Sequence, residues 1–437
     1  MSLRASPLAP LAATGSLLLR SGLLRHRGTL PVLRRGGLAA VLGVAALRAP
    51  HTPLLVRDHD AVTGAQLEAA ITATAVAMAE RWPAGTALGI RGDGGIDFVV
   101  ALAAAGLAGV DAMPIGPRHG DADVSVLAGS LDAVVASWEI VDRADTPSPL
   151  PDRPHGRILL LSTGTGGVPG ATVRGGPGRR GMLQLADAER RVHLPAGPVL
   201  ALAPPDHGHG LTTMLAALVR GRTTLLASGM RPLEQAELAV RRRPATISGV
   251  PAQLARMLDA GPSVLDGVRL VISGSSGLPP ALRARLAAHG ARVLDCYGTT
   301  ETGTVTIEGR PLAGVRIEVD ADHRLRIASP LSHGVLHDPG DLGRVHRGRL
   351  VVEGRHGDLV DSGGELFSLT RVGTTLRSIP GVVDATVLSE PDDLLGARLV
   401  AEVVVSDPAL DADALTRELT ARLGRAGVPR RLNVTVR

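Results

Sequence analysis

Short apolar runs alternate with longer alanine- and leucine-rich stretches from about residue 52 to residue 350. The run at 86–90 is followed by a helical stretch at 96–109 and a second run at 132–136. Short apolar strands that are separated by helices indicate an α/β fold with largely parallel sheets. Further strands are predicted at 157–161, 198–203, 223–227, 268–272 and 292–295, and a loop rich in Gly, Pro and Arg is predicted at 174–181.

The pattern changes after a segment at 341–366 that is dense in Gly, Arg and Asp. The elements predicted beyond it are typical of a compact α+β unit, namely a helix at 370–378, strands at 382–388 and 398–405, and a helix at 412–424. A hinge is expected near 354–358. We therefore expect a basic N-terminal segment at 1–51, a large domain at 52–353 and a small domain at 354–437.

The first 57 residues contain eight arginines and no acidic residue. Two apolar stretches lie there, Leu17–Leu24 and Gly37–Leu47, and both are shorter than the ~20 residues that cross a bilayer. We expect basic amphipathic helices that pack on the body or contact an anionic membrane surface. The expected location is the cytoplasm, with membrane association as an open alternative.

Composition excludes several kinds of chemistry. The 437 residues include no lysine, so neither a Schiff base nor a phosphate-binding lysine can form. The net charge is only +5 and aromatic residues make up 1%, which argues against nucleic-acid binding. Cys296 is the single cysteine, so an intrachain disulfide and a cysteine zinc site are excluded.

A glycine- and hydroxyl-rich run, Leu160–Gly170, follows an apolar strand. Glycines let backbone N–H groups converge on an anion, and the hydroxyls of Ser162, Thr163 and Thr165 add donors. The run is not a Walker A loop, because that motif requires a lysine. It is either a phosphate-binding loop or a flexible surface turn.

A second run, Asp295–Gly303, also follows an apolar strand and contains Tyr297, the only tyrosine. The tyrosine ring can stack on a base, Thr300 can donate to a phosphate, and the Glu301 carboxylate can bind Mg²⁺. The alternative is a strand-end turn with a solvated glutamate.

Together the two runs resemble the adenylate-forming family, which includes acyl-CoA synthetases, firefly luciferase and peptide-synthetase adenylation domains. The first is similar to the signature S/T-S/T-G-S/T-T-G-x-P-K-G and departs from it at Gly166, Gly170 and Ala171. The second matches Y-G-x-T-E without departure. Further segments resemble family motifs in the family's order: Phe98–Gly106, Ala203–Leu211, Gly249–Leu254, Ser273–Pro279, Gly340–Gly343 and Gly354–Glu365.

The resemblance implies a large domain with mixed and parallel sheets and a small C-terminal α+β domain. It implies a ligase that activates a carboxylic acid, for which we expect a fatty acid, through an acyl-adenylate, with ATP, Mg²⁺ and CoA as cofactors. A carrier protein is an alternative acceptor to CoA. The implied site residues are Ser162, Thr163, Gly164, Thr165, Gly167 and Thr300 for phosphates, Glu301 for the metal, Tyr297, Gly298 and Ser275 for adenine, Asp341 and Arg355 for ribose, and His207 beside the acyl group.

The missing lysines leave alternatives open. Relatives carry one lysine in the phosphate loop, where Gly170 stands here, and another near the C-terminus, in a segment that we expect to be absent. Arg430 or Arg437 can supply charge, but arginine is larger and planar. The chain is therefore a ligase, a weakened protein that binds a nucleotide or acyl-adenylate, or an enzyme of the thioester-forming half-reaction. His207 and His209 are alternatively plain loop histidines.

Overall fold

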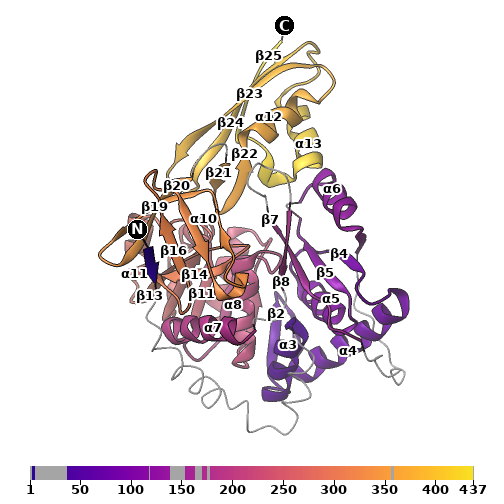
Figure 1. Ribbon diagram of the computed structural model, residues 1–437, viewed down its shortest axis with the longest axis vertical. Helices are drawn as coiled ribbons and strands as arrows, with labels where there is room; N and C mark the ends of the chain where they lie inside the picture. Colours follow the sequence, from indigo (N-terminus) through magenta and orange to yellow (C-terminus); the bar gives the residue numbers. More distant parts are fainter. Residues whose placement is uncertain are drawn as a thin grey trace.

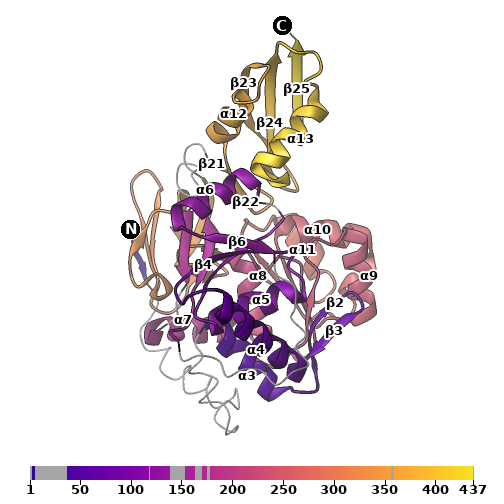
Figure 2. The ribbon, with the colours of Figure 1, turned by 90° about the vertical axis from the view of Figure 1, so that its right-hand side faces the viewer.

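The computed structural model describes residues 2–4, 37–117, 119–137, 153–162, 170–174, 178–355 and 359–436. The main body contains two large sheets with helices on their faces, and residues 359–436 form a smaller C-terminal unit at one end of it (Figures 1 and 2). Within these ranges, no helix has both the length and the apolarity that crossing a membrane requires.

The larger sheet of the body, here called the central sheet, is parallel over most of its width. Its order is β15 (Arg310–Pro311), β14 (Gly303–Ile307), β13 (Arg292–Thr299), β12 (Leu270–Gly274), β11 (Thr246–Gly249), β9 (Val199–Ala201), β10 (Thr224–Leu226), β2 (Pro53–Arg57) and β3 (Asp60–Thr63). Strands β13 to β2 are parallel, while β14 and β3 are antiparallel to their neighbours. Helices cover both faces of the parallel strands, so these strands are buried and apolar.

A second sheet lies beside the central sheet in the order β6 (Val134–Ser137), β4 (Ala87–Arg91), β5 (Asp111–Ile115), β7 (Ile158–Ser162) and β8 (Gly170–Arg174). Its strands are parallel except for β8. The glycine-rich run joins β7 to β8, and residues 163–169 of that run are outside the described residues.

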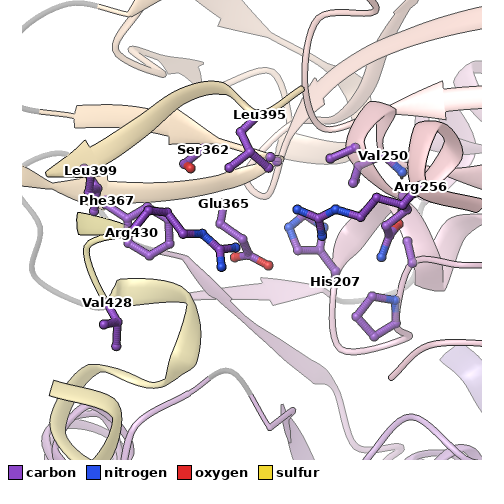
Figure 3. Close-up of a pocket in the computed structure, with 16 residues that line it drawn as sticks. His207, Val250, Arg256, Ser362, Glu365, Phe367, Leu395, Leu399, Val428 and Arg430 are labelled. Atoms are coloured by element: carbon purple, nitrogen blue, oxygen red, sulfur yellow. Dashed lines mark hydrogen bonds between the residues drawn. The ribbon is translucent and has the colours of Figure 1, made fainter. Parts of the chain in front are cut away.

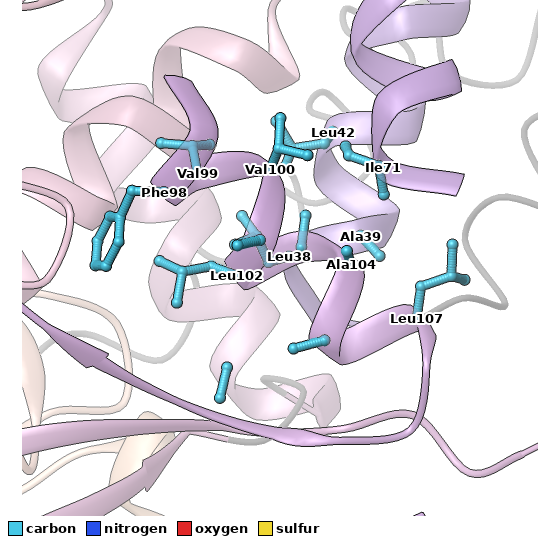
Figure 4. Close-up of a cluster of buried hydrophobic side chains, with 14 of the residues drawn as sticks. Leu38, Ala39, Leu42, Ile71, Phe98, Val99, Val100, Leu102, Ala104 and Leu107 are labelled. Atoms are coloured by element: carbon cyan, nitrogen blue, oxygen red, sulfur yellow. The ribbon is translucent and has the colours of Figure 1, made fainter. Parts of the chain in front are cut away.

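Helix α5 (Ile96–Leu107) joins the two sheets into one core (Figure 4). Apolar residues occupy nearly every position of this helix, and a helix that is apolar all round is stable only when it is buried. It packs against α3 (Gly37–Arg48), α4 (Gly64–Arg81), α8 (Gly208–Val219) and strands of both sheets. The second N-terminal apolar stretch is therefore a core helix, while Leu17–Leu24 lies outside the described residues.

The remaining helices of the body cover the sheets or connect them. They are α6 (Asp121–Leu131), α7 (Gly178–Val192), α9 (Pro232–Arg242), α10 (Pro251–Ala260) and α11 (Pro280–Ala287), with 3-10 turns at Pro262–Leu265 and Pro330–Ser332. A small sheet of β1 (Ser2–Arg4), β16 (Arg316–Val319), β17 (Leu325–Ala328) and β18 (Leu336–His337) and the hairpin β19 (Asp341–His346) and β20 (Arg349–Arg355) complete the body.

The C-terminal unit has a core of its own. Its elements are the hairpin β21 (Leu359–Ser362) and β22 (Glu365–Ser368), helices α12 (Leu369–Arg377) and α13 (Ala412–Leu423), a 3-10 turn at Arg425–Gly427, and a sheet of β23 (Val382–Asp392), β24 (Gly396–Val405) and β25 (Arg431–Val436). Both figures place the hairpin at the junction with the body.

This architecture confirms the expected α/β fold with a small α+β unit. The loop predicted at 174–181 is wrong from Gly178 onward, because α7 begins there. The buried face of α7 carries Gln184 and Asp187. Gln184 donates to the carbonyl of Thr304, and Asp187 pairs with Arg190 and Arg191, so polar contacts anchor the helix. Its first four residues are two glycines and two arginines, a composition that is typical of a loop, which is why the start of the helix was not predicted.

Candidate functional site

Four of the motif segments, those that contain His207, Val250, Ser275 and Tyr297, meet at one edge of the central sheet. Strands β9, β11, β12 and β13 are parallel, so their carboxyl ends lie side by side. In open α/β sheets this edge is where ligands bind. His207, Val250, Ser275 and Tyr297 follow or end these strands, and the fold therefore brings together residues that lie 90 positions apart.

Tyr297, Asp341 and Arg355 form a polar cluster in which Asp341 contacts the other two residues. The phenol of Tyr297 donates to Asp341 Oδ2 at 2.7 Å, and Arg355 Nε lies 3.0 Å from Asp341 Oδ1. Arg355 also donates to the Pro339 carbonyl at 2.9 Å, which fixes the guanidinium. Three residues predicted to hold a nucleotide are thus joined through Asp341, a residue that is 3% exposed.

Burial controls the protonation of this cluster. It raises the pKa of Tyr297 well above its ordinary value, and the charges of Asp341 and Glu301 add to that effect. Burial also raises the pKa of Asp341, while the Arg355 charge and the Tyr297 hydrogen bond oppose the rise. The phenol is therefore a hydrogen-bond donor at neutral pH, and the carboxylate depends on Tyr297 and Arg355 for its charge.

The turn after Tyr297 presents Thr300 and Glu301. A Cβ at Gly298 would lie 2.2 Å from the Gly303 carbonyl oxygen, so this close turn requires glycine. Across the turn, the Thr299 and Thr302 hydroxyls are 3.0 Å apart. No group of three or more His, Cys, Asp or Glu in the described part of the chain is arranged to hold a metal. A lone carboxylate beside a phosphate site nevertheless suits Mg²⁺, which takes one or two carboxylates and completes its shell with phosphates and water.

The sequence analysis missed a contact that joins the C-terminal unit to this edge. Ser276 donates to Asp361 Oδ2 at 2.7 Å, and the Gly364 amide donates to Asp361 Oδ1 at 2.9 Å. Burial raises the pKa of Asp361, and its hydrogen bonds oppose the rise. Ser276 and Asp361 both lie inside matched segments, but their pairing depends on the docking of β21 against the loop after β12.

A cavity of about 190 Å³ lies between the C-terminal unit and the body (Figure 3). Arg430 and Arg256 reach toward it from opposite sides, Glu365 lies between them, and His207 borders it from the body. Apolar side chains such as Phe367 line the remainder. The lining of the cavity is therefore partly charged and partly apolar.

The structure brings together part of the predicted site. Tyr297, Asp341 and Arg355 touch, and Glu301 lies close enough to Tyr297 to influence its pKa. The predicted residues at one strand end or in the turn are Ser275, Gly298 and Thr300. Ser162 ends β7, whereas Thr163, Gly164, Thr165 and Gly167 lie outside the described residues, so their approach to Tyr297 stays a prediction. Arg430 lies at the interdomain cavity.

Residues 179–357 match the model of a family described as AMP-binding enzyme. A probable 2-succinylbenzoate–CoA ligase from Mycobacterium tuberculosis is 31% identical over 265 residues, which cover 54% of this chain and 69% of that protein. A sulfoacetate–CoA ligase from Cupriavidus necator is 29% identical over 364 residues, covering 72% and 70%.

Solved structures agree with the fold. A malonyl-CoA ligase in complex with methylmalonyl-CoA and AMP is similar with a TM-score of 0.72 and 26% identity, over 88% of this chain and 95% of that chain. An o-succinylbenzoate CoA synthetase from Bacillus subtilis gives a TM-score of 0.76 at 21% identity, over 90% and 94% of the two chains.

Proposed function

Since this chain belongs to the AMP-binding enzyme family, we propose that it is a ligase that activates a carboxylic acid as an acyl-adenylate and transfers the acyl group to CoA. The expected class, an acid–thiol ligase, is confirmed by the family, and ATP, Mg²⁺ and CoA are the cofactors of that class. The observation that carries the proposal is the contact of Tyr297, Asp341 and Arg355 beside the docked C-terminal unit.

The proposed roles follow from the chemistry of each group. The carboxylate of Asp341 has lone pairs left to accept from ribose hydroxyls, and Arg355 fixes its orientation. Glu301 would hold Mg²⁺ on the phosphates together with the hydroxyl of Thr300. Tyr297, Gly298 and Ser275 form the side on which adenine would lie. The loop with Ser162, Thr163, Gly164, Thr165 and Gly167 would close over the phosphates.

The interdomain cavity suits the thiol arm of the acceptor. It opens between two arginines, whose charge favours phosphate groups, and it leads to His207 at the sheet edge. A thiolate that arrives there attacks the acyl carbonyl, forms the thioester bond and displaces AMP. We propose CoA as the acceptor, with a carrier protein as the alternative, and we propose that the chain divides into 1–51, 52–353 and 354–437.

The identity of the acid is the finer part of the proposal. A fatty acid remains the prediction from the sequence, but two relatives are named for 2-succinylbenzoate and sulfoacetate, which are compact polar acids. We propose that this chain also takes a compact acid. Contact of the N-terminal segment with a membrane surface has no support from the described residues, because α3 is buried in the core.

A second candidate function keeps the pocket but lacks efficient adenylation. It is favoured by the absence of lysine and by the position of Arg430 at the cavity. Losing one preorganised donor typically lowers kcat by about 10²–10³-fold. A protein that carries out only thioester formation lies between the two candidates.

ATP–pyrophosphate exchange with a panel of short, aromatic and long-chain acids tests the proposal. Exchange that depends on one acid supports the full ligase, and the chain-length profile identifies the acid. Asp341→Asn should weaken AMP binding and exchange, whereas Asp259→Asn, which alters only an exposed pair with Arg285, should leave both unchanged. AMP binding without exchange, together with thioester formation from a supplied acyl-adenylate, would identify the half-reaction enzyme, and AMP binding alone would identify the binding protein.

A further inference from the structure

A chain of polar side chains runs through the interior of the body at the same sheet edge. The hydroxyls of Thr213 on α8 and Ser248 on β11 are 2.9 Å apart, and Ser248 Oγ lies 3.0 Å from His209 Nε2. Thr213 and Ser248 are 8% and 1% exposed, so their hydroxyls depend on each other for partners. The hydroxyl of Thr213 therefore positions that of Ser248, which in turn fixes the orientation of the His209 ring through Nε2.

Gly274 provides the space that the imidazole occupies. A Cβ at Gly274 would lie 2.5 Å from His209 Nδ1 and 2.7 Å from its Cε1, so any larger residue would displace the ring. Gly274 ends β12 and is paired in register with Cys296, the residue before Tyr297. The Nδ1–Cε1 side of the His209 ring thus lies against the end of β12, beside the strand that carries Tyr297.

The other nitrogen of the ring remains available. Nδ1 has no hydrogen-bond partner among the described residues, although the ring is only partly exposed. His209 is two residues from His207, which borders the interdomain cavity. In the proposed function, an acid whose reacting carboxyl group lies between the turn of Thr300 and His207 would extend along this edge toward His209.

The charge state of the ring restricts what it can recognise. Burial lowers the pKa of His209 to about 4, so the imidazole is neutral at pH 7. The hydroxyls of Ser248 and Thr213 can each reverse direction, so Nδ1 can either donate or accept one hydrogen bond. A neutral ring with a single hydrogen bond compensates poorly for burying a carboxylate or sulfonate, whereas it satisfies a hydroxyl or a carbonyl.

We propose that His209 Nδ1, positioned by Ser248 and Thr213, selects acids that carry an uncharged hydroxyl or carbonyl group away from the reacting carboxylate. This inference rests on the proposed function, because it assigns the acid side of the same site. It separates this chain from relatives named for acids with a second anionic group, such as sulfoacetate.

Binding of non-hydrolysable acyl-sulfamoyl adenosines tests the inference without requiring catalysis. Two matched pairs exchange a hydroxyl for a methyl group: 3-hydroxybenzoyl with 3-methylbenzoyl, and 4-hydroxybutanoyl with pentanoyl. By calorimetry, the hydroxyl member of at least one pair should bind about tenfold more tightly, the scale of one buried hydrogen bond. The succinyl analogue, which adds a second carboxylate, should bind more weakly than the 4-hydroxybutanoyl analogue.

Two variants assign the preference to the polar chain. His209→Leu should bring the hydroxyl-to-methyl ratio to about one without weakening the methyl analogue. Ser248→Ala keeps the ring but removes its positioning partner, and it should reduce the ratio severalfold. AMP binding, which should stay unchanged, verifies that each variant is folded, and Ser248→Ala decides the question if the His209 variant does not fold.

The possible failures are distinguishable. Equal affinity within both pairs, tightest binding of the succinyl analogue, or a hydroxyl preference that survives in the variants would each overturn the inference while the ligase assignment stands. If the wild-type protein binds neither AMP nor any analogue, the proposed function and the inference both fail.

Discussion

Replacing Asp295 with asparagine should stabilise the protein at neutral pH and have much less effect in acid. Asp295 lies on β13, two residues before Tyr297, and burial raises its pKa from 3.8 to about 6 despite the opposing charge of Arg283. The Glu308 carboxylate also raises the pKa. The folded protein therefore carries a partly buried carboxylate at pH 7, which is better solvated in the unfolded chain.

The raised pKa of Asp295 makes the stability of the protein depend on pH. Between pH 3.8 and 6 the folded state binds a proton that the unfolded state has lost, so stability decreases as the pH rises through this window. A shift of about two units corresponds to about 3 kcal/mol once both states are ionised. The same relation gives a cost of about 1.5 kcal/mol at pH 5, where Asp295 is still mostly protonated in the folded state.

Urea denaturation followed by circular dichroism at pH 5, 6 and 7 measures this cost. Asp295→Asn cannot ionise, so its stability relative to wild type should grow by about 1–1.5 kcal/mol between pH 5 and pH 7. Asp259→Asn makes the same substitution at an exposed carboxylate and is the matched control. If the stability difference between Asp295→Asn and wild type does not change with pH, the pKa of Asp295 is not raised in the folded protein and the argument is refuted.

Three other changes test the site. Tyr297→Phe removes the donor to Asp341 and should cost about 1.5–3 kcal/mol of stability, together with severalfold weaker AMP binding, measured by denaturation and calorimetry. Ser276→Ala removes a hydrogen bond to Asp361 and should shift the C-terminal unit toward an undocked state by about 1 kcal/mol, seen as a lower transfer efficiency between fluorophores on α10 and α13. Removing Mg²⁺ with EDTA should weaken ATP binding at least tenfold and leave AMP binding nearly unchanged, since Mg²⁺ binds through phosphates; equal loss of both would contradict the role of Glu301.

The parts of the fold that the sequence predicted well are those in which a single element determines its own burial. Helix α5 and strands such as β12 are apolar throughout, so composition alone reveals them. Strand β5 was missed because it contains Asp111 and Pro114, which are unusual in a buried strand. Asp111 is tolerated there because Arg157 forms a paired contact with both of its oxygens. That partner lies 46 residues away, and a local pattern cannot indicate it.

In the candidate site, too, local motifs revealed some residues, while others depend on contacts between distant parts of the chain. Tyr297, Asp341 and Arg355 were found through short motifs. Tyr297 lies near the end of a parallel strand, where ligands bind in such sheets, and Asp341 and Arg355 are cross-strand partners in the hairpin of β19 and β20. Ser276 and Asp361 were passed over because their contact spans 85 residues and requires the C-terminal unit to dock. His209 was left open as a loop residue, since its role depends on the hydroxyl of Ser248 and on the missing side chain of Gly274.

Several carboxylates influence the polar cluster of Tyr297, Asp341 and Arg355, in a chain that has no lysine. In addition to burial, the charges of Asp361 and Asp338 raise the pKa of Asp341, and the charge of Glu301 raises the pKa of Tyr297. Among the described residues, Arg355 is the cation in contact with Asp341. Arg355 already neutralises Asp341, so it has little charge left for a triphosphate. Other cations must balance the phosphates, and in a chain without lysine they can only be arginines, protonated histidines or the metal. In the proposed ligase, Mg²⁺ therefore carries a large share of the phosphate stabilisation that a lysine would otherwise supply.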